Sequence, residues 1–130
     1  MTKSEHIDYW INSANEDWKA VFSLFDGRNY VQSLFFAHLV LKKITKAIWV
    51  KNNESNVPPK IHSIIKLLSQ TPVILNAEQM DYLVEVNKFQ LEGRYPDYKN
   101  NLYKICNKEF TDNSIKKISG IRECLIENLR

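Results

Sequence analysis

The segment Arg94-Tyr95-Pro96-Asp97-Tyr98 holds the densest set of residues that could do chemistry. An arginine beside a turn fixed by proline can offer two parallel donors to a phosphate, and the rings of Tyr95 and Tyr98 could stack on a base. The same residues also fit a structural role, in which Arg94 pairs with Asp97 and the tyrosines pack the turn onto the fold. Arg94, Tyr95, Asp97 and Tyr98 are therefore candidates for nucleotide or phosphate binding.

Three histidines are the candidates for acid–base work. His62 follows Pro58-Pro59 at the start of a short predicted helix, where it could line a cleft or order the loop, and we keep it as a candidate binding residue. His38 falls on an apolar helix face, which is typical of a hydrogen-bonded core histidine. His6 lies near the start of the sequence, where chain ends fray.

Lys42, Lys43 and Lys46 form a short basic run within one predicted helix. Residues three and four apart are neighbours on a helix surface, so these ammonium groups could attract phosphate together. Lys43 and Lys46 are kept as candidates for phosphate binding. The alternative is a solvated face, with the lysine stems lying over apolar surface.

Several other kinds of site are not indicated. The three glycines do not cluster into a phosphate-binding loop. Cys106 and Cys124 have neither a disulfide-framework pattern nor the spacing of metal ligands. No serine, histidine and aspartate spacing resembles a nucleophile elbow. We therefore expect no metal and no cofactor.

The composition fits one globular domain over residues 1–130. The chain is 15.3 kDa, with 44% hydrophobic and 25% charged residues, and its formal net charge of +3 is too small to predict nucleic-acid binding by itself. No apolar run reaches the roughly 18 residues of a membrane span, and the polar start is unlike a signal peptide. We expect a cytoplasmic protein that does not bind membranes.

The apolar period along the chain is helical and predicts an all-α, five-helix antiparallel up-and-down bundle. The predicted helices are one from an N-cap at Ser4 to Asp26, one from Tyr30 to Lys51, a short one around Ile61–Leu68, one after an N-cap at Asn76 that ends at Gly93, and one after an N-cap at Thr111 or Asp112. The stretch Lys99–Phe110 fits either a short helix or a loop. The second helix is apolar almost all round, which indicates a central helix or one that also faces a partner.

Two glycines carry specific expectations. Gly27, directly after the first helix, fits the left-handed residue that often ends helices. Gly120 lies inside the last helix, where glycine costs about 1 kcal/mol relative to alanine. Close approach of a neighbouring helix is one reason for a glycine there.

Three stretches together resemble the HEPN family of small α-helical domains. They are the aromatic-rich first helix leading into Asp26-Gly27-Arg28-Asn29-Tyr30, the run Ser33–Ala47, and the pair of segments Pro58–Ile64 and Arg94–Tyr98. In the run Ser33–Ala47, Lys43, Lys46 and Ala47 match the family's Glu-Lys-x-x-Lys-Ala signature, while Lys42 replaces its acid. The resemblance extends from about residue 5 to the end of the chain.

The resemblance implies a helical bundle of the kind that pairs with nucleotidyltransferases, usually a homodimer. Many members of the family act on or with nucleotides or RNA. Some are metal-independent ribonucleases of toxin–antitoxin and defence systems, which use an Arg-x4-6-His pair, and others are partners of a minimal nucleotidyltransferase.

No Arg-x4-6-His occurs in this sequence. Counted from Arg94, the histidine would fall at Lys99, Asn100 or Asn101, and counts from Arg28 and Arg122 also miss. We therefore expect a non-catalytic nucleotide- or RNA-associated binding module that acts with a nucleotidyltransferase or toxin–antitoxin partner.

Two alternatives stay open. One is a metal-independent ribonuclease with a non-standard site, in which Arg94 holds phosphate and His62 or Tyr98 is the base. The other is a helical protein-interaction module whose second helix binds a partner.

Overall fold

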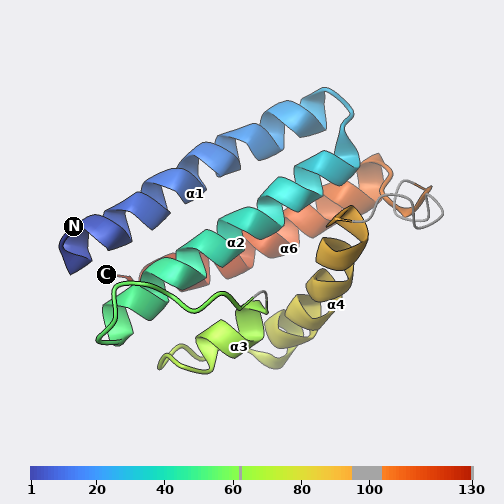
Figure 1. The fold of residues 1–130 in the computed structure, drawn as a ribbon. Helices are drawn as coiled ribbons and strands as arrows, with labels where there is room; N and C mark the ends of the chain where they lie inside the picture. Colours follow the sequence, from blue (N-terminus) through green and yellow to red (C-terminus); the bar gives the residue numbers. More distant parts are fainter. Residues whose placement is uncertain (62, 95–103, 130) are drawn as a thin grey trace.

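The structure, a computed structural model, describes residues 1–61, 63–94 and 104–129, except for the side chains of 86–94. The helices in these residues are α1 (Lys3–Asp26), α2 (Tyr30–Asn52), α3 (Ile64–Leu68), α4 (Ala77–Arg94) and α6 (Lys108–Glu127). No strand occurs in the described part of the chain. The predicted all-α bundle is confirmed, and the long helices α1 and α2 run antiparallel (Figure 1).

α2 is the central helix. It contacts α1, α6, α3 and α4, and in Figure 1 it lies between α1 on one side and α6 and α4 on the other. More than half of its residues are buried. The fully enclosed apolar side chains of α2 include Ala37, Val40, Leu41, Ala47, Ile48 and Val50. The expectation of a central second helix is confirmed, and most of its apolar surface is covered within this chain.

The two longest neighbours of α2 present apolar stripes to it. Ala14 and Val21 of α1 have no exposed surface, and Ile118 and Leu125 of α6 have none either. Where α1 meets α2, the Ser33 hydroxyl donates a hydrogen bond of 2.7 Å to the Val21 carbonyl. A buried hydroxyl with a partner avoids the cost of an unsatisfied polar group.

Two of the three predicted N-caps are wrong. Thr2 caps α1 in place of Ser4, because its side chain accepts from the Glu5 backbone amide while Glu5 reaches back to Thr2. Asn107 caps α6 in place of Thr111 or Asp112, and its side chain accepts from the Phe110 amide at 2.8 Å. Both helices begin with a polar turn that precedes their apolar stripe. The predicted cap Asn76 is confirmed, since its side chain accepts from the Gln79 amide at 2.8 Å.

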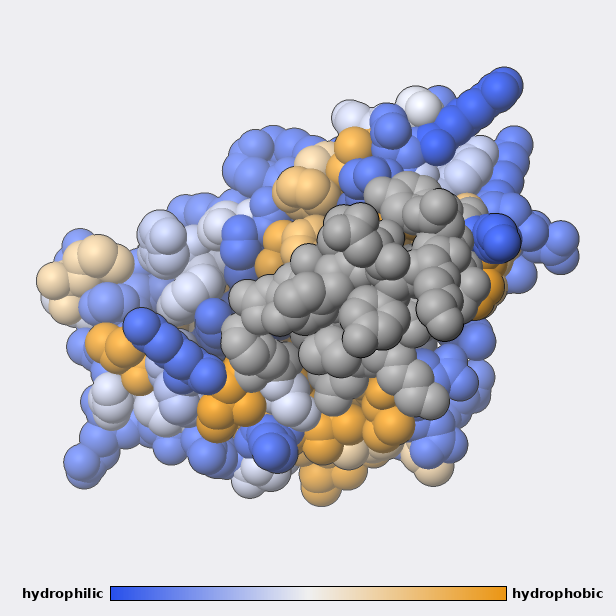
Figure 2. Space-filling view, turned by 45° about the vertical axis from the view of Figure 1, so that its right-hand side comes forward, coloured by the Kyte–Doolittle hydropathy of each residue, from blue (hydrophilic) through white to orange (hydrophobic). Residues whose placement is uncertain are grey.

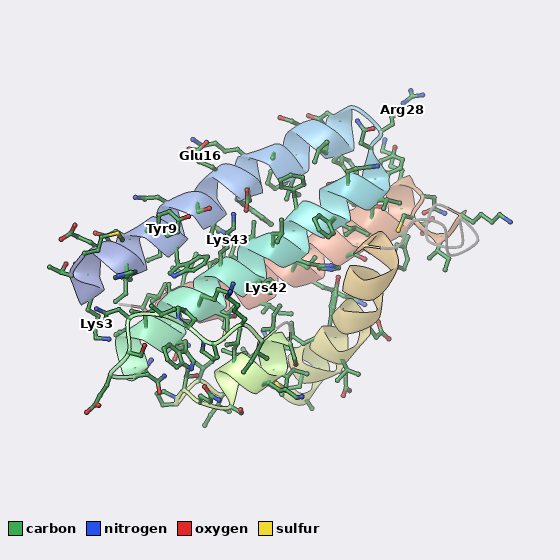
Figure 3. The ribbon with its side chains drawn as sticks, viewed as in Figure 1. Lys3, Tyr9, Glu16, Arg28, Lys42 and Lys43 are labelled. Carbon is green, nitrogen blue, oxygen red and sulfur yellow. The ribbon has the colours of Figure 1, made fainter. Side chains whose placement is uncertain are left out.

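The turn between α1 and α2 also differs from the expectation for Gly27. Gly27 has a φ of −80°, and the left-handed residue is Arg28, with a φ of 64°. A Cβ on Gly27 would lie 3.1 Å from Nδ2 of Asn29, so glycine gives the turn space rather than left-handed freedom. Arg28 is exposed and extends away from the bundle at the end of α1 (Figure 3).

Lysine side chains cap the C-terminal ends of two helices. The Lys3 ammonium donates to the carbonyl oxygens of Val50 and Asn53, each at 2.7 Å, at the end of α2. Lys51 donates to the Asn128 carbonyl at 3.1 Å, at the end of α6. The last carbonyls of a helix lack intrahelical partners and carry partial negative charge, so an ammonium group there is stabilising. Lys3 thereby ties the start of α1 to the end of α2.

Exposed apolar side chains are dispersed over the molecule. Phe22 on α1, Ile74 before α4 and Val84 on α4 are all exposed. On the face drawn in Figure 2, the coloured apolar side chains form separate patches among hydrophilic ones. No helix among the described residues is long and apolar enough to cross a membrane.

Replacing Lys3 with methionine removes the ammonium group that caps α2. We expect Lys3→Met to lower the free energy of unfolding by about 1–2 kcal/mol, the range for hydrogen bonds to charged groups. Urea denaturation of the variant and the wild type measures the difference. Lys19→Met is the matched control, because the Lys19 side chain is 75% exposed and should cost less than about 0.5 kcal/mol. Equal values for the two variants would show that Lys3 does not act as a cap.

Candidate functional site

Lys43 lies between α1 and α2 and is bound there on the α1 side (Figure 3). Its Nζ is 2.6 Å from Oδ2 of Asp17 and 2.7 Å from Oγ of Ser13. The side chains of Lys43 and Asp17 are only 23% and 16% exposed. A charge pair this poorly solvated is strengthened by the low dielectric around it, so Lys43 joins the two helices.

Lys46 lies one turn further along α2 and contacts the same neighbour. Its Nζ is 4.7 Å from the centre of the Trp10 ring, within the range of a cation–π interaction. Trp10 also packs edge-on against Tyr9. Burial lowers the pKa of Lys46 below its usual value, and the charge of Lys43 adds to this effect. Lys46 therefore stabilises the packing of α1 on α2.

These contacts correct the interpretation of the basic run as a solvated face. Lys42, Lys43 and Lys46 are all half-buried. The run is basic because α1 offers a carboxylate, a hydroxyl and an indole ring to the lysines at 43 and 46. Their contacts account for both ammonium groups without a phosphate.

His38 is a core residue, as its place on the apolar face of α2 predicts. Its exposed fraction is 1%, and burial lowers the pKa of its imidazole to about 4. The ring is therefore neutral near pH 7 and shielded from solvent. An acid–base residue must reach its substrate, so His38 is unsuited to that task.

The other predicted site residues fall largely outside the described part of the chain. Arg94 is the last residue of α4, and its side chain is not described. Tyr95, Asp97, Tyr98 and His62 also lie outside the described residues. Whether Arg94 meets His62 and the tyrosines in one cleft stays a prediction.

No group of three or more histidine, cysteine, aspartate or glutamate side chains suited to a metal ion occurs within the described ranges. Cys106 and Cys124 are not joined in a disulfide, and the first is buried while the second is half-buried.

Arg122 on α6 makes a contact that the sequence did not predict. The guanidinium carbon of Arg122 lies 5.0 Å from the centre of the Trp18 ring on α1. Trp18 in turn packs edge-on against Phe22, with 5.0 Å between ring centres. This stack bridges two helices that both pack on α2. The sequence places Trp18 on the apolar face of the first helix and Arg122 on the inner face of the last one, but it does not show that the two side chains are in contact.

Comparison with known families decides the class of the chain. The model of the HEPN domain matches residues 7–129, nearly the full length. The chain belongs to the HEPN family. This confirms the resemblance carried by the matching segments of the first two helices, the Pro-Pro loop and the Arg-Tyr-Pro stretch.

The fold of this HEPN domain is also similar to that of a solved protein. The crystal structure of TT1696 from Thermus thermophilus superposes with a TM-score of 0.80, and the match covers 94% of this chain and 97% of that one. The two sequences are 16% identical, so the likeness concerns the fold. No curated protein matches the chain.

Removing the Lys43 charge should destabilise the HEPN fold rather than a ligand site. We expect Lys43→Met to lower the free energy of unfolding by about 2–3 kcal/mol, since it leaves Asp17 poorly solvated and without its ammonium partner. Urea denaturation of Lys43→Met, Asp17→Leu and the double variant forms a thermodynamic cycle. The loss in the double variant should be at most half of the sum of the losses in the two single variants. Additive losses would show that the two charges act independently.

The burial of His38 makes stability depend on pH. The folded imidazole has a pKa of about 4 against an ordinary 6.5, so the unfolded chain takes up a proton first as the pH falls. Protonation of the unfolded chain therefore lowers the free energy of unfolding as the pH falls from 6.5 to 4. The loss is roughly 2–3 kcal/mol at pH 4.5. Urea denaturation at pH 7 and 4.5 should show a smaller pH effect in His38→Gln than in the wild type. An equal pH effect in the two proteins would contradict this assignment.

Proposed function

We propose that this HEPN domain is a non-catalytic binding module for a nucleotide or RNA, acting with a nucleotidyltransferase or a toxin–antitoxin partner. The observation that carries the proposal is the absence of Arg-x4-6-His from a chain that belongs to the HEPN family. The family's ribonucleases need that pair to hold phosphate and to move a proton at the 2′-hydroxyl. A domain that keeps the bundle without the pair is best suited to binding.

The state of His38 supports this proposal. Of the two histidines in the middle of the chain, His38 is enclosed in the core with its pKa lowered to about 4. It therefore does not replace the missing histidine of the family motif. A ribonuclease activity would have to rest on His62 or Tyr98 as an unusual base.

In the proposed function, the guanidinium group of Arg94 binds the phosphate. Lys43 and Lys46 were predicted to contribute, but Lys43 is bound to Asp17 and Ser13, and Lys46 lies over an indole ring. Arg94 directly precedes Tyr95 in the sequence, and Asp97 and Tyr98 follow three and four residues after Arg94. A guanidinium next to two aromatic residues suits a nucleotide, which combines a phosphate with a flat base. We further propose a cytoplasmic homodimer, the usual state of the family.

Removing the Arg94 guanidinium should abolish most nucleotide binding. We expect Arg94→Ala to weaken the binding of ATP and of a short single-stranded RNA at least tenfold, measured by isothermal titration calorimetry. Arg28→Ala is the matched control, because Arg28 is an exposed arginine on the α1–α2 turn, and it should bind as the wild type does. Equal binding by both variants, or no binding by the wild type, would contradict the proposal.

Incubation with RNA in the presence of EDTA separates binding from catalysis. The proposal predicts intact RNA even at high protein concentration. Cleavage that disappears in His62→Ala or Tyr98→Phe would instead support the ribonuclease alternative with a non-standard site.

A further inference from the structure

Arg122, in the C-terminal half of α6, is held against α1 without a hydrogen-bond acceptor. Its guanidinium carbon lies 5.0 Å from the centre of the Trp18 ring. Within the described residues, no oxygen accepts a hydrogen bond from Arg122 and no carboxylate forms an ion pair with it. Its Nε is enclosed and unpaired, whereas Nη1 and Nη2 are not enclosed. Arg122 therefore presents two unpaired donor groups to the solvent between α1 and α6.

Other cationic side chains that join two helices of this chain do have acceptors. Lys3 donates to the Val50 and Asn53 carbonyls, and Lys43 binds Asp17 and Ser13. Polar groups that lose water on folding are nearly always hydrogen-bonded. The unpaired guanidinium of Arg122 departs from that pattern, and an acceptor supplied by another molecule would complete it.

The geometry of Arg122 suits a planar oxyanion. The Trp18 ring restrains the guanidinium group, and the two open Nη atoms form a fork that matches the two oxygens of a carboxylate. Ser119 lies three residues earlier on α6, so it neighbours Arg122 on the helix surface. Its side chain is half-buried, and its hydroxyl makes no hydrogen bond with a described residue. The Ser119 hydroxyl is therefore available as a further donor beside the fork.

An exposed aromatic ring adjoins this fork on the α1 side. Trp18 packs edge-on against Phe22, with 5.0 Å between ring centres, and Phe22 is 45% exposed. Tryptophan and arginine are the residue types that most often contribute strongly to binding at protein interfaces. The surface therefore combines an unpaired fork with apolar area that another side chain could cover.

We propose that the surface formed by Trp18, Phe22, Ser119 and Arg122 binds an acidic segment of a partner protein. A carboxylate of the partner sits on the Arg122 fork, and an apolar neighbour covers Phe22. A carboxylate suits the site better than a phosphate, because a single guanidinium matches one negative charge. The adjacent Glu123 is exposed and makes no ion pair with a described residue, so it would repel a doubly charged phosphate more strongly. The surface is separate from Arg94, which ends α4.

A matched pair of capped tripeptides tests this binding on the wild-type protein. One is acetyl-Leu-Glu-Phe-amide, and the control, acetyl-Leu-Gln-Phe-amide, has the same shape without the carboxylate. Titration of ¹⁵N-labelled protein at low salt, followed through the indole N–H signal of Trp18, should show saturable binding of the glutamate peptide in the millimolar range. The glutamine peptide should bind at least fivefold more weakly, because it brings no charge to the fork.

Arg122→Lys separates the fork from the positive charge. Lysine can keep a cation over the Trp18 ring but lacks two parallel donors. Binding of the glutamate peptide should therefore fall at least fivefold, while the melting temperature stays close to that of the wild type. Arg28→Lys is the matched control, because Arg28 is exposed on the α1–α2 turn, and it should bind within twofold of the wild type.

Several results would overturn the proposal. It is wrong if the glutamate peptide does not bind, if the two peptides bind equally, or if Arg122→Lys and Arg28→Lys bind equally. Inorganic phosphate that shifts the Trp18 signal at lower concentration than the glutamate peptide would assign the fork to a phosphate ligand instead. A dimer in analytical ultracentrifugation that Arg122→Lys dissociates would assign the surface to a second copy of this chain and contradict the choice of partner.

Discussion

The structure depends on the need to cover α2 on almost every side. A helix with apolar residues around most of its circumference is stable in water only when other elements surround it. Here α1, α6, α3 and α4 all contact α2. The two cores described by buried side chains both include α2, the larger one through Leu41 and Ile48 and the smaller through Trp49 and Val50. Each of the other described helices therefore packs against α2.

Covering α2 also determines the roles of its polar residues. Ser33, His38 and Thr45 are buried, and the hydroxyls of Ser33 and Thr45 donate to backbone carbonyls at 2.7 Å. Lys43 and Lys46 reach the surface only past α1, and there they bind its carboxylate and indole groups. The helix that most resembles the family signature therefore uses its polar side chains for structure. In the proposed function, recognition of phosphate rests on Arg94, at the end of α4, and on the residues that follow it in the sequence.

The helical pattern of the sequence was sufficient to predict the α-helical class, the central position of α2 and its bounds to within one residue. The helical class and the bounds of α2 could be predicted because they depend on the spacing of apolar residues, which can be read from the local sequence. A helix N-cap depends on whether one side chain reaches one backbone amide, which the apolar period does not record. The apolar stripes that suggested Ser4 and Thr111 begin only after the first turn of each helix. The left-handed conformation was expected at Gly27, because glycine adopts it most readily, but Arg28 has it in the structure.

Candidate site residues could be predicted by type but not by contact. The sequence from Lys42 to Lys46 does not indicate which side chains of the first helix these lysines contact. The structure shows that they are Asp17, Ser13 and Trp10. Likewise, the sequence suggested that Gly120 permits a close helix approach, and this expectation is wrong for the described residues, because no described atom lies within 4 Å of the position that its Cβ would take. Long-range pairing of this kind is fixed by the register of two helices, which single-sequence periodicity leaves open.

Lys43 and Lys46 of α2 serve the fold, whereas we propose that phosphate binds at the end of α4. Titration of ¹⁵N-labelled protein with ATP, followed by heteronuclear NMR, distinguishes the two places. We expect the amide shifts to change mainly in residues 91–98 and the signals from residues 42–46 to stay in place. Changes centred on residues 42–46 and on the facing residues 10–17 of α1 would contradict it.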